Sequence, residues 1–270
     1  MSDLIARMRP ALSKVPEITV MFWVAKLLTT GMGETTWDWF DGSLGQAVAV
    51  SLTSVLFVAA MVTQFAVRAY NPWAYWFAIV MVSVFGTTIA DLAHNDFGIP
   101  YTVSTLVLLG LVGLTFALWY RVEGTLSIHS ITTRRREVFY WTAVLLTFAL
   151  GTAAGDWTAS TLHLGYLPSG LIFLVAFVLP AVAYRWFGLN AIVAFWLSYI
   201  MTRPLGASFA DYFGGPRGRG GIALGMEPVS IVLTVVIVAV VAYFAITRVD
   251  RPRGLAACAT AEIASSPSAR

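Results

Sequence analysis

The sequence predicts an all-α membrane protein with eight transmembrane helices, arranged as four parallel helical hairpins around a common axis. The first observation behind this prediction is composition: of 270 residues, 58% are hydrophobic and 11% are charged. A soluble domain carries about 25% charged residues. The second is a series of long apolar segments, which are continuous rather than alternating and therefore favour helices over strands. The third is a pattern of aromatic, glycine and aspartate residues that occurs four times.

Eight segments are long enough to cross a hydrocarbon core, which takes roughly 20 helical residues. They cover residues 17–40, 46–69, 73–94, 101–120, 137–161, 167–185, 188–212 and 228–248.

Every second segment contains the same frame of residue types. An aromatic pair is followed by a glycine eleven residues after its first member, and an aspartate lies five residues beyond the glycine. The four copies are Phe22-Trp23, Gly33 and Asp38; Tyr75-Trp76, Gly86 and Asp91; Tyr140-Trp141, Gly151 and Asp156; and Phe195-Trp196, Gly206 and Asp211. Such fixed spacing indicates four internal repeats, near 15–70, 71–122, 135–186 and 188–248. Two helices per repeat leave all copies in the same orientation.

Basic residues predict the orientation in the membrane. One side carries Arg7, Arg9, Lys14, Arg68, Arg121, Arg134, Arg135, Arg136, Arg185 and Arg248. The other side carries only Arg217 and Arg219, within a glycine-rich run at 214–221 that we expect to be a flexible loop. The positive-inside rule therefore places both termini in the cytoplasm. The linker 121–136 joins the two halves of the transmembrane domain 1–248, and residues 249–270 are expected to form a disordered cytoplasmic tail.

The four frames FWVAKLLTTGMGETTWD, YWFAIVMVSVFGTTIAD, YWTAVLLTFALGTAAGD and FWLSYIMTRPLGASFAD carry a family resemblance. They resemble a bacterial family of uncharacterised, membrane-anchored multi-span proteins built from a hydrophobic repeat of unknown function. The resemblance covers roughly residues 15–248, and copies one and four replace a threonine with Glu34 and Ala207. It implies a four-repeat layout in the bacterial inner membrane and carries no activity with it.

Residues four apart share one face of a helix, so each frame also defines a stripe. The stripes are Lys26, Thr30, Glu34 and Asp38; Ile79, Ser83, Thr87 and Asp91; Val144, Phe148, Thr152 and Asp156; and Tyr199, Arg203, Ala207 and Asp211. A charge at the bilayer centre costs about 2.5–3.5 kcal/mol on insertion scales, so these stripes should face the interior of the bundle. The frame glycines are expected to let the helices pack closely.

The carboxylates Glu34, Asp38, Asp91, Asp156 and Asp211 are the predicted ion-binding and metal-ligating residues. We expect hydroxyl support from Thr30, Thr87 and Thr152, with His94 as a further candidate ligand. Such hard oxygen ligands suit Mg²⁺, Mn²⁺, Ca²⁺ or protons. In the alternative interpretation, each aspartate simply ends its helix at the outer water boundary.

Lys26 and Arg203 are the predicted charge-balancing residues. They are expected either to neutralise Glu34 and Asp211 or to take a direct part in transport, because buried charges need partners in either case.

The favoured function is transport of a small cation, with a divalent metal as the first candidate and proton exchange as an option. Two alternatives stay open: a cation-coupled carrier of a small organic solute, and a membrane anchor or sensor that transports nothing. The chain lacks a Walker A loop, a dinucleotide fingerprint and a His-Glu-x-x-His helix, so no enzyme activity is expected. Beyond a bound metal ion no cofactor is expected, and the expected partners are the lipid bilayer and a cation, with no nucleic acid.

Overall fold

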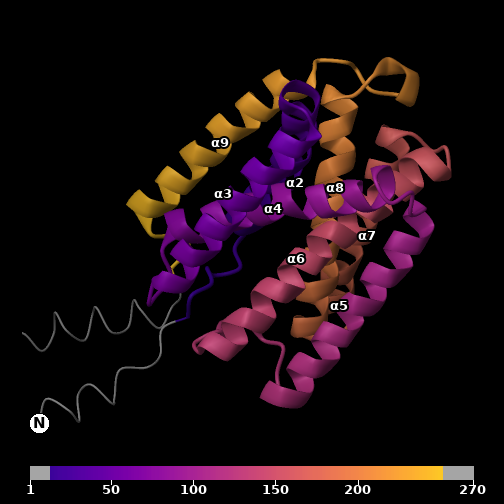
Figure 1. Cartoon of the computed structure of the whole chain (residues 1–270). Coiled ribbons are helices and arrows are strands. Elements are labelled where there is room, and N and C mark those ends of the chain that lie inside the picture. The colour runs from indigo at the N-terminus through magenta and orange to yellow at the C-terminus, as the bar shows by residue number, and fades with distance from the viewer. Residues whose placement is uncertain (1–12, 252–270) are drawn as a thin grey trace, which may run out of the picture.

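The computed structural model describes residues 13–251, and within that range the chain forms eight long α-helices and no strand. They are α2 (Val20–Leu44), α3 (Gln46–Ala66), α4 (Pro72–Asn95), α5 (Tyr101–Glu123), α6 (Arg134–Asp156), α7 (Tyr166–Phe187), α8 (Ala191–Gly214) and α9 (Met226–Thr247). Two 3₁₀ turns (Ile128–Ser130 and Arg217–Arg219) and a π turn (Trp157–Thr161) complete the described elements. Figure 1 shows the helices running between two ends of an elongated bundle. Each helix coincides with one of the eight predicted segments, to within a few residues at its ends.

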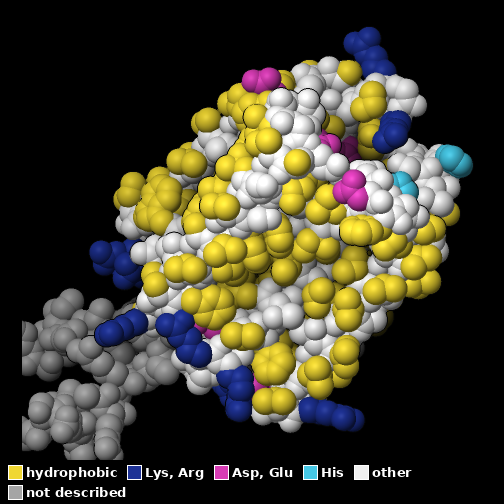
Figure 2. Space-filling model, viewed as in Figure 1, with side chains coloured by type: hydrophobic (Ala, Val, Ile, Leu, Met, Phe, Trp, Pro, Cys, Tyr) yellow, Lys and Arg dark blue, Asp and Glu magenta, His cyan; other side chains and the backbone are white. Residues whose placement is uncertain are grey.

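Six of these helices, all except α2 and α8, are long and apolar enough to cross a membrane, which indicates an integral membrane protein. Outward-facing side chains such as Val55, Leu106 and Val235 are more than half exposed, as lipid contact requires. Figure 2 shows a broad hydrophobic band, with Lys and Arg side chains gathered beyond its lower edge. The two remaining helices are less apolar because they carry the charged residues of the first and fourth stripes.

An inner ring of four helices, α2, α4, α6 and α8, forms the centre of the protein. Helix α2 packs against α4 and α8, and α6 packs against the same two neighbours, so the ring is closed. The prediction that the frame glycines mediate close packing is confirmed. A Cβ added at Gly33 would lie 2.9 Å from the backbone carbon of Ser83, and one at Gly86 would lie 2.8 Å from the Phe148 Cβ.

The same close approach occurs at the other two crossings of the ring. A Cβ at Gly151 would lie 2.8 Å from the Pro204 Cδ, and one at Gly206 would lie 3.0 Å from the Gly31 nitrogen. Each frame glycine therefore faces the next helix of the ring, and the glycine of α8 faces α2.

The outer helices α3, α5, α7 and α9 correct one feature of the predicted hairpins. Each packs mainly against the inner helix that follows it in the ring, with α9 returning to α2, rather than against its own hairpin partner. Contacts between specific side chains account for the packing of each outer helix against the following inner helix. Phe57 of α3 stacks on Phe85 of α4 with ring centroids 4.4 Å apart, and Thr36 of α2 hydrogen-bonds Ser230 of α9 at 2.6 Å. Each outer helix thus joins two neighbouring repeats.

The N-terminal segment 13–19 crosses one end of the ring. We call this segment the strap, and we call this end of the ring the strap end. Lys14 forms a buried ion pair with Glu137 at 2.6 Å, and the backbone N–H of Glu17 donates to the carbonyl of Asp250 at 2.9 Å. Asp250 is buried and accepts a hydrogen bond from the Tyr70 hydroxyl, and burial raises the pKa of Asp250. The tail predicted to be disordered from residue 249 therefore begins with a docked residue. Residues 252–270 and the predicted basic residues Arg7 and Arg9 lie outside the described residues.

We expect Gly206→Ala to destabilise the protein, because a new methyl group would press on the Thr30 Cβ at 2.8 Å and on the α2 backbone. Overpacking of this kind typically costs about 1–3 kcal/mol. Gly110→Ala in α5 is the matched control, since in the described chain its Cβ would meet no atom within 4 Å. The control should keep or raise the unfolding temperature in detergent, because alanine favours a helix more than glycine does. Equal unfolding temperatures for the two variants would contradict the packing role.

Candidate functional site

A polar cavity of about 310 Å³ lies at the end of the ring opposite the strap, which we call the cavity end. All five predicted carboxylates line it: Glu34, Asp38, Asp91, Asp156 and Asp211. The described lining residues outside the prediction are Asn95, Tyr101, Ser160, Tyr166 and Arg219. The equal spacing of the frames explains the convergence, because it brings the aspartates to the same height on helices that surround one axis. Their role as ligands stays a prediction.

Three of the carboxylates lie close together. Glu34, Asp156 and Asp211 each offer one oxygen atom, and these oxygens all lie within 4.8 Å of one another. The Asp211 side chain is buried, and its Oδ1 atom has no hydrogen-bond partner within residues 13–251. The Asp91 carboxylate differs, because the indole N–H of Trp37 donates to its Oδ2 atom at 2.6 Å. The cluster thus presents at least one buried carboxylate oxygen, Asp211 Oδ1, without a hydrogen-bond partner in the described residues.

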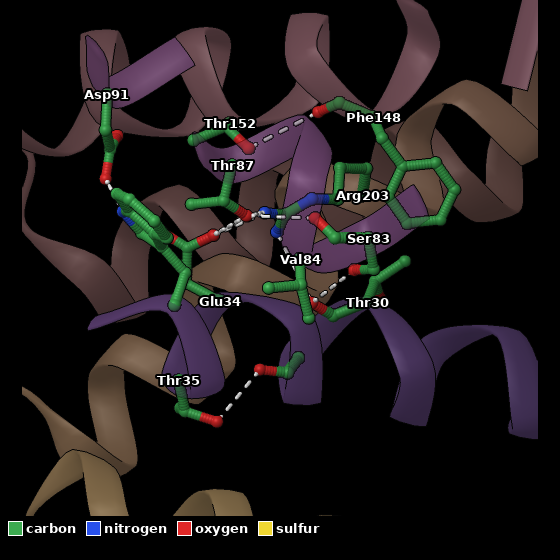
Figure 3. A network of polar contacts seen from close by, with 12 residues as sticks. Thr30, Glu34, Thr35, Ser83, Val84, Thr87, Asp91, Phe148, Thr152 and Arg203 are labelled. Carbon is green, nitrogen blue, oxygen red and sulfur yellow. Dashed lines mark hydrogen bonds and ion pairs between the residues drawn. The ribbon is translucent and has the colours of Figure 1, made fainter. Parts of the chain in front are cut away.

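Arg203 is the centre of the polar network in Figure 3, which joins the cavity-lining Glu34 to Thr87 and Thr30 and which we call the floor of the cavity. Its Nη2 atom donates to the Glu34 carboxylate and to the Thr87 hydroxyl, and its Nη1 atom donates to the Thr30 carbonyl at 3.4 Å. The arginine and its carboxylate partner are both buried. Arg203 thus pairs with Glu34, one of the two carboxylates named in the charge-balancing prediction, and not with Asp211. Arg203 and Asp211 lie eight positions apart on one helix, roughly 12 Å along its axis, whereas Glu34 approaches from the neighbouring helix α2.

Lys26 lies below this floor and outside the cavity. Its Nζ atom is buried and has no hydrogen-bond partner in the described part of the chain. It lies 3.6 Å from the ring centroid of Phe148 and 4.2 Å from that of Tyr199, so its partners are aromatic faces. The predicted pairing of Lys26 with Glu34 is wrong, because Arg203 already occupies the carboxylate.

The three threonines predicted as ligands do not belong to the described cavity lining. Thr30 donates its hydroxyl to the Leu27 carbonyl at 2.7 Å and the Thr202 carbonyl at 3.1 Å. Thr152 donates to the Phe148 carbonyl at 3.3 Å, and Thr87 contacts Arg203. Threonine hydroxyls inside helices often bond to backbone carbonyls in this way, which gives these three side chains a local structural role.

His94 does line the cavity, and its surroundings define its tautomer. The ring stacks on Tyr101 with centroids 3.7 Å apart, and Nδ1 lies 3.0 Å from the carbonyl oxygen of Ile99. Because a carbonyl only accepts, Nδ1 is the donor, and a neutral His94 carries its lone pair on Nε2. A histidine oriented by a carbonyl in this way is a typical metal ligand.

The lining residues that the sequence did not predict lie at helix ends and in the connections between helices. Ser160 lies in the π turn after Asp156, Tyr166 begins α7, and Arg219 ends the 3₁₀ turn between α8 and α9. Interaction with the Tyr166 hydroxyl raises the pKa of Arg219, which keeps this side chain cationic. None of these residues belongs to the repeated frame, so the spacing of the frame could not predict that they line the cavity.

We expect Glu34 and Arg203, which are in direct contact, to be energetically coupled, and we expect no such coupling between Glu34 and Lys26. Glu34→Gln alone should lower the free energy of unfolding by about 3–5 kcal/mol, because a buried guanidinium loses its counter-charge. Adding Arg203→Met should recover part of that loss, whereas adding Lys26→Met should give an additive result. Unfolding of all single and double variants in detergent measures both cycles. Additivity of the first pair, or strong coupling of the second, would contradict the assignment.

Comparison with known proteins identifies a family but no activity. No curated protein matches this chain, and no solved structure matches it. The family model described as Repeat of Unknown Function (DUF347) matches residues 74–125, 139–189 and 194–250. These matches cover more than half of the chain and correspond to the helix pairs α4–α5, α6–α7 and α8–α9. The chain therefore belongs to this family of repeats of unknown function.

Proposed function

We propose that this protein transports a small cation across the membrane, with a divalent metal such as Mn²⁺ or Mg²⁺ as the cargo. The observation that carries the proposal is the convergence of five carboxylates on one cavity, three of them with oxygens within 4.8 Å of one another. Carboxylate oxygens are the preferred ligands of these hard cations. One of these three carboxylates, Asp211, has a buried Oδ1 atom without a hydrogen-bond partner in the described residues, which leaves it available to a cation.

The charge balance of the cavity supports a cationic cargo. Among the described lining residues and their direct ion-pair partners, five carboxylates face two arginines, Arg203 and Arg219. With all of them ionised, five minus two leaves three negative charges in a confined space. Carboxylates this close cannot all stay ionised without a bound cation, so metal and protons should compete for them.

We further infer that all eight helices cross the membrane as four parallel repeats around one axis, with both termini in the cytoplasm of a bacterium. Helices α2 and α8 have 25 and 24 residues, long enough to span, and they bury the charged residues Lys26, Glu34, Arg203 and Asp211. The cyclic contacts of the frame glycines support the pseudo-symmetry. Basic residues near the strap end support its cytoplasmic location, which makes the cavity end external.

A carrier fits the interior better than an open channel. Below the four aspartates lie the Arg203–Glu34 pair and then Phe148, and farther down Tyr75 and Tyr140 join their hydroxyls at 2.6 Å. These buried layers close the ring toward the strap end. Passage therefore requires a conformational change, as in transporters with alternating access.

A second candidate, a carrier of a small organic solute coupled to a cation, is favoured by the size and mixed charge of the cavity. A volume of about 310 Å³ exceeds what one bare ion needs, and Arg219 joins the acids in its wall. Since one water takes about 30 Å³, the space fits either a hydrated ion or a small solute. Flux assays with both classes of cargo distinguish the two functions.

We expect Mn²⁺ flux into liposomes containing the purified protein to fall on acidification, because protons compete with the metal for the carboxylates. Asp156→Asn should lower the flux roughly tenfold or more while the protein still purifies as a folded species. Asp96→Asn is the matched control, since this exposed carboxylate does not line the cavity and hydrogen-bonds Gln46 at 2.9 Å. Wild-type flux in Asp156→Asn, or no flux in the unmodified protein, would contradict metal transport.

The orientation can be tested by thiol labelling in a Cys258→Ser background. Single cysteines at Ser43 and Asp96, both exposed near the cavity end, should react with an impermeant reagent in intact cells. A cysteine at His129, exposed near the strap end, should react only after the cells are permeabilised. Labelling of position 129 in intact cells would reverse the orientation.

A further inference from the structure

Arg219 is one of only two basic residues on the predicted outer side of the chain. The structure places Arg219 in the wall of the carboxylate cavity. Arg217, two residues earlier on the same 3₁₀ turn, is not among the described lining residues. The positive-inside rule disfavours arginines on the outer side, so membrane topology does not account for the position of Arg219 beside the acidic cavity.

The loop that carries Arg219 is tied down by its backbone, contrary to the expectation of a flexible loop. The Ile222 N–H donates to the Tyr212 carbonyl at 2.8 Å, and the Leu224 N–H donates to the Phe213 carbonyl at 3.0 Å. On the other side, a Cβ added at Gly165 would lie 3.2 Å from the Arg219 carbonyl oxygen, so the loop sits tightly on the chain entering α7. The backbone thus holds Arg219 at the mouth while its side chain stays exposed.

Arg219 lines the carboxylate cavity without forming an ion pair with the described acids. Arginine stays charged at every physiological pH. Yet within residues 13–251 Arg219 makes no ion pair within 4.0 Å, whereas Arg203 is in direct contact with Glu34. Asp156 is close enough to act on Arg219 electrostatically, and the Tyr166 hydroxyl interacts with it. Arg219 therefore lowers the negative potential of the cavity and leaves the oxygen atoms accessible.

We propose that Arg219 is a tethered counter-cation, which stabilises the empty carboxylate cavity and weakens the binding of the transported cation. This inference rests on the proposed function of the cavity as a cation site. In the empty state the arginine offsets the mutual repulsion of the carboxylates. In the loaded state it repels the cargo. A transport site must bind well enough to load and weakly enough to release, and a fixed positive charge at the mouth adjusts that balance.

The test compares Arg219→Gln with its neighbour Arg217→Gln, which removes the same charge from the same turn. Mn²⁺ binding to purified protein in detergent is measured by calorimetry, and Mn²⁺ flux is measured in liposomes. Arg219→Gln should tighten Mn²⁺ binding by about three- to tenfold, since a like charge near the cavity is lost. Arg217→Gln and Arg219→Lys should stay within about twofold of the unmodified protein, because the first charge lies outside the cavity and the second is retained. High salt should shrink the effect, because Arg219 is exposed to screening.

Each other outcome overturns the inference in a recognisable way. Equal tightening in Arg217→Gln would assign the effect to general surface charge. Unchanged Mn²⁺ affinity in Arg219→Gln, with binding still lost in Asp156→Asn, would overturn the inference and leave the proposed function standing. Loss of binding of a small zwitterionic amino acid in Arg219→Gln would make the arginine a ligand for a solute carboxylate. Absence of Mn²⁺ binding to the unmodified protein would overturn both proposals.

Discussion

A buried guanidinium needs a carboxylate partner, and the centre of this protein is built around that requirement. Arg203 of α8 pairs with Glu34 of α2, and it also donates to the Thr87 hydroxyl of α4. Because the two charges come from different helices, the ring must close for either to be satisfied. Removing one partner of such a pair is far costlier than removing both. The pair therefore links the packing of the ring to the floor of the cavity above it.

The repeats share one backbone plan and differ in the side chains placed on it. At each crossing of the ring, a frame glycine faces the same stripe position of the next helix, which holds Thr30, Ser83, Phe148 or Arg203. Without a Cβ, glycine gives this position room for a hydroxyl, a ring or a guanidinium alike. This stripe position can therefore hold a member of an ion pair at one crossing and an aromatic ring at another, with the same close spacing of the helices. The aspartates above this level stayed the same in all four copies.

Residue spacing along the chain predicted the helices and the acids of the cavity, because both depend on periodicity within single segments. Contacts between helices could not be predicted from that spacing. Spacing shows that Lys26 and Glu34 share a face of α2, but it cannot show that Arg203 reaches across from α8 and takes the carboxylate. The outer helices were misjudged for the same reason, since their neighbours are selected by contacts such as Phe57 on Phe85. Tyr166 begins α7 and Arg219 lies on the connection between α8 and α9, so both lie outside the repeated frame and its spacing could not predict them.

Arg203 and Arg219 both offset the negative charge of the acids, and they differ in how deeply each arginine is buried. Arg203 is enclosed, so its ion pair is shielded from salt and its loss would leave a charge stranded in the bundle. Arg219 is exposed on a loop, so its influence is weaker and changes with ionic strength. A cation that stabilises the fold acts best from a buried position, and the counter-cation that we propose acts best beside the cavity without occupying its oxygen atoms. The positions of the two residues, one in the floor and one at the mouth, match these two requirements.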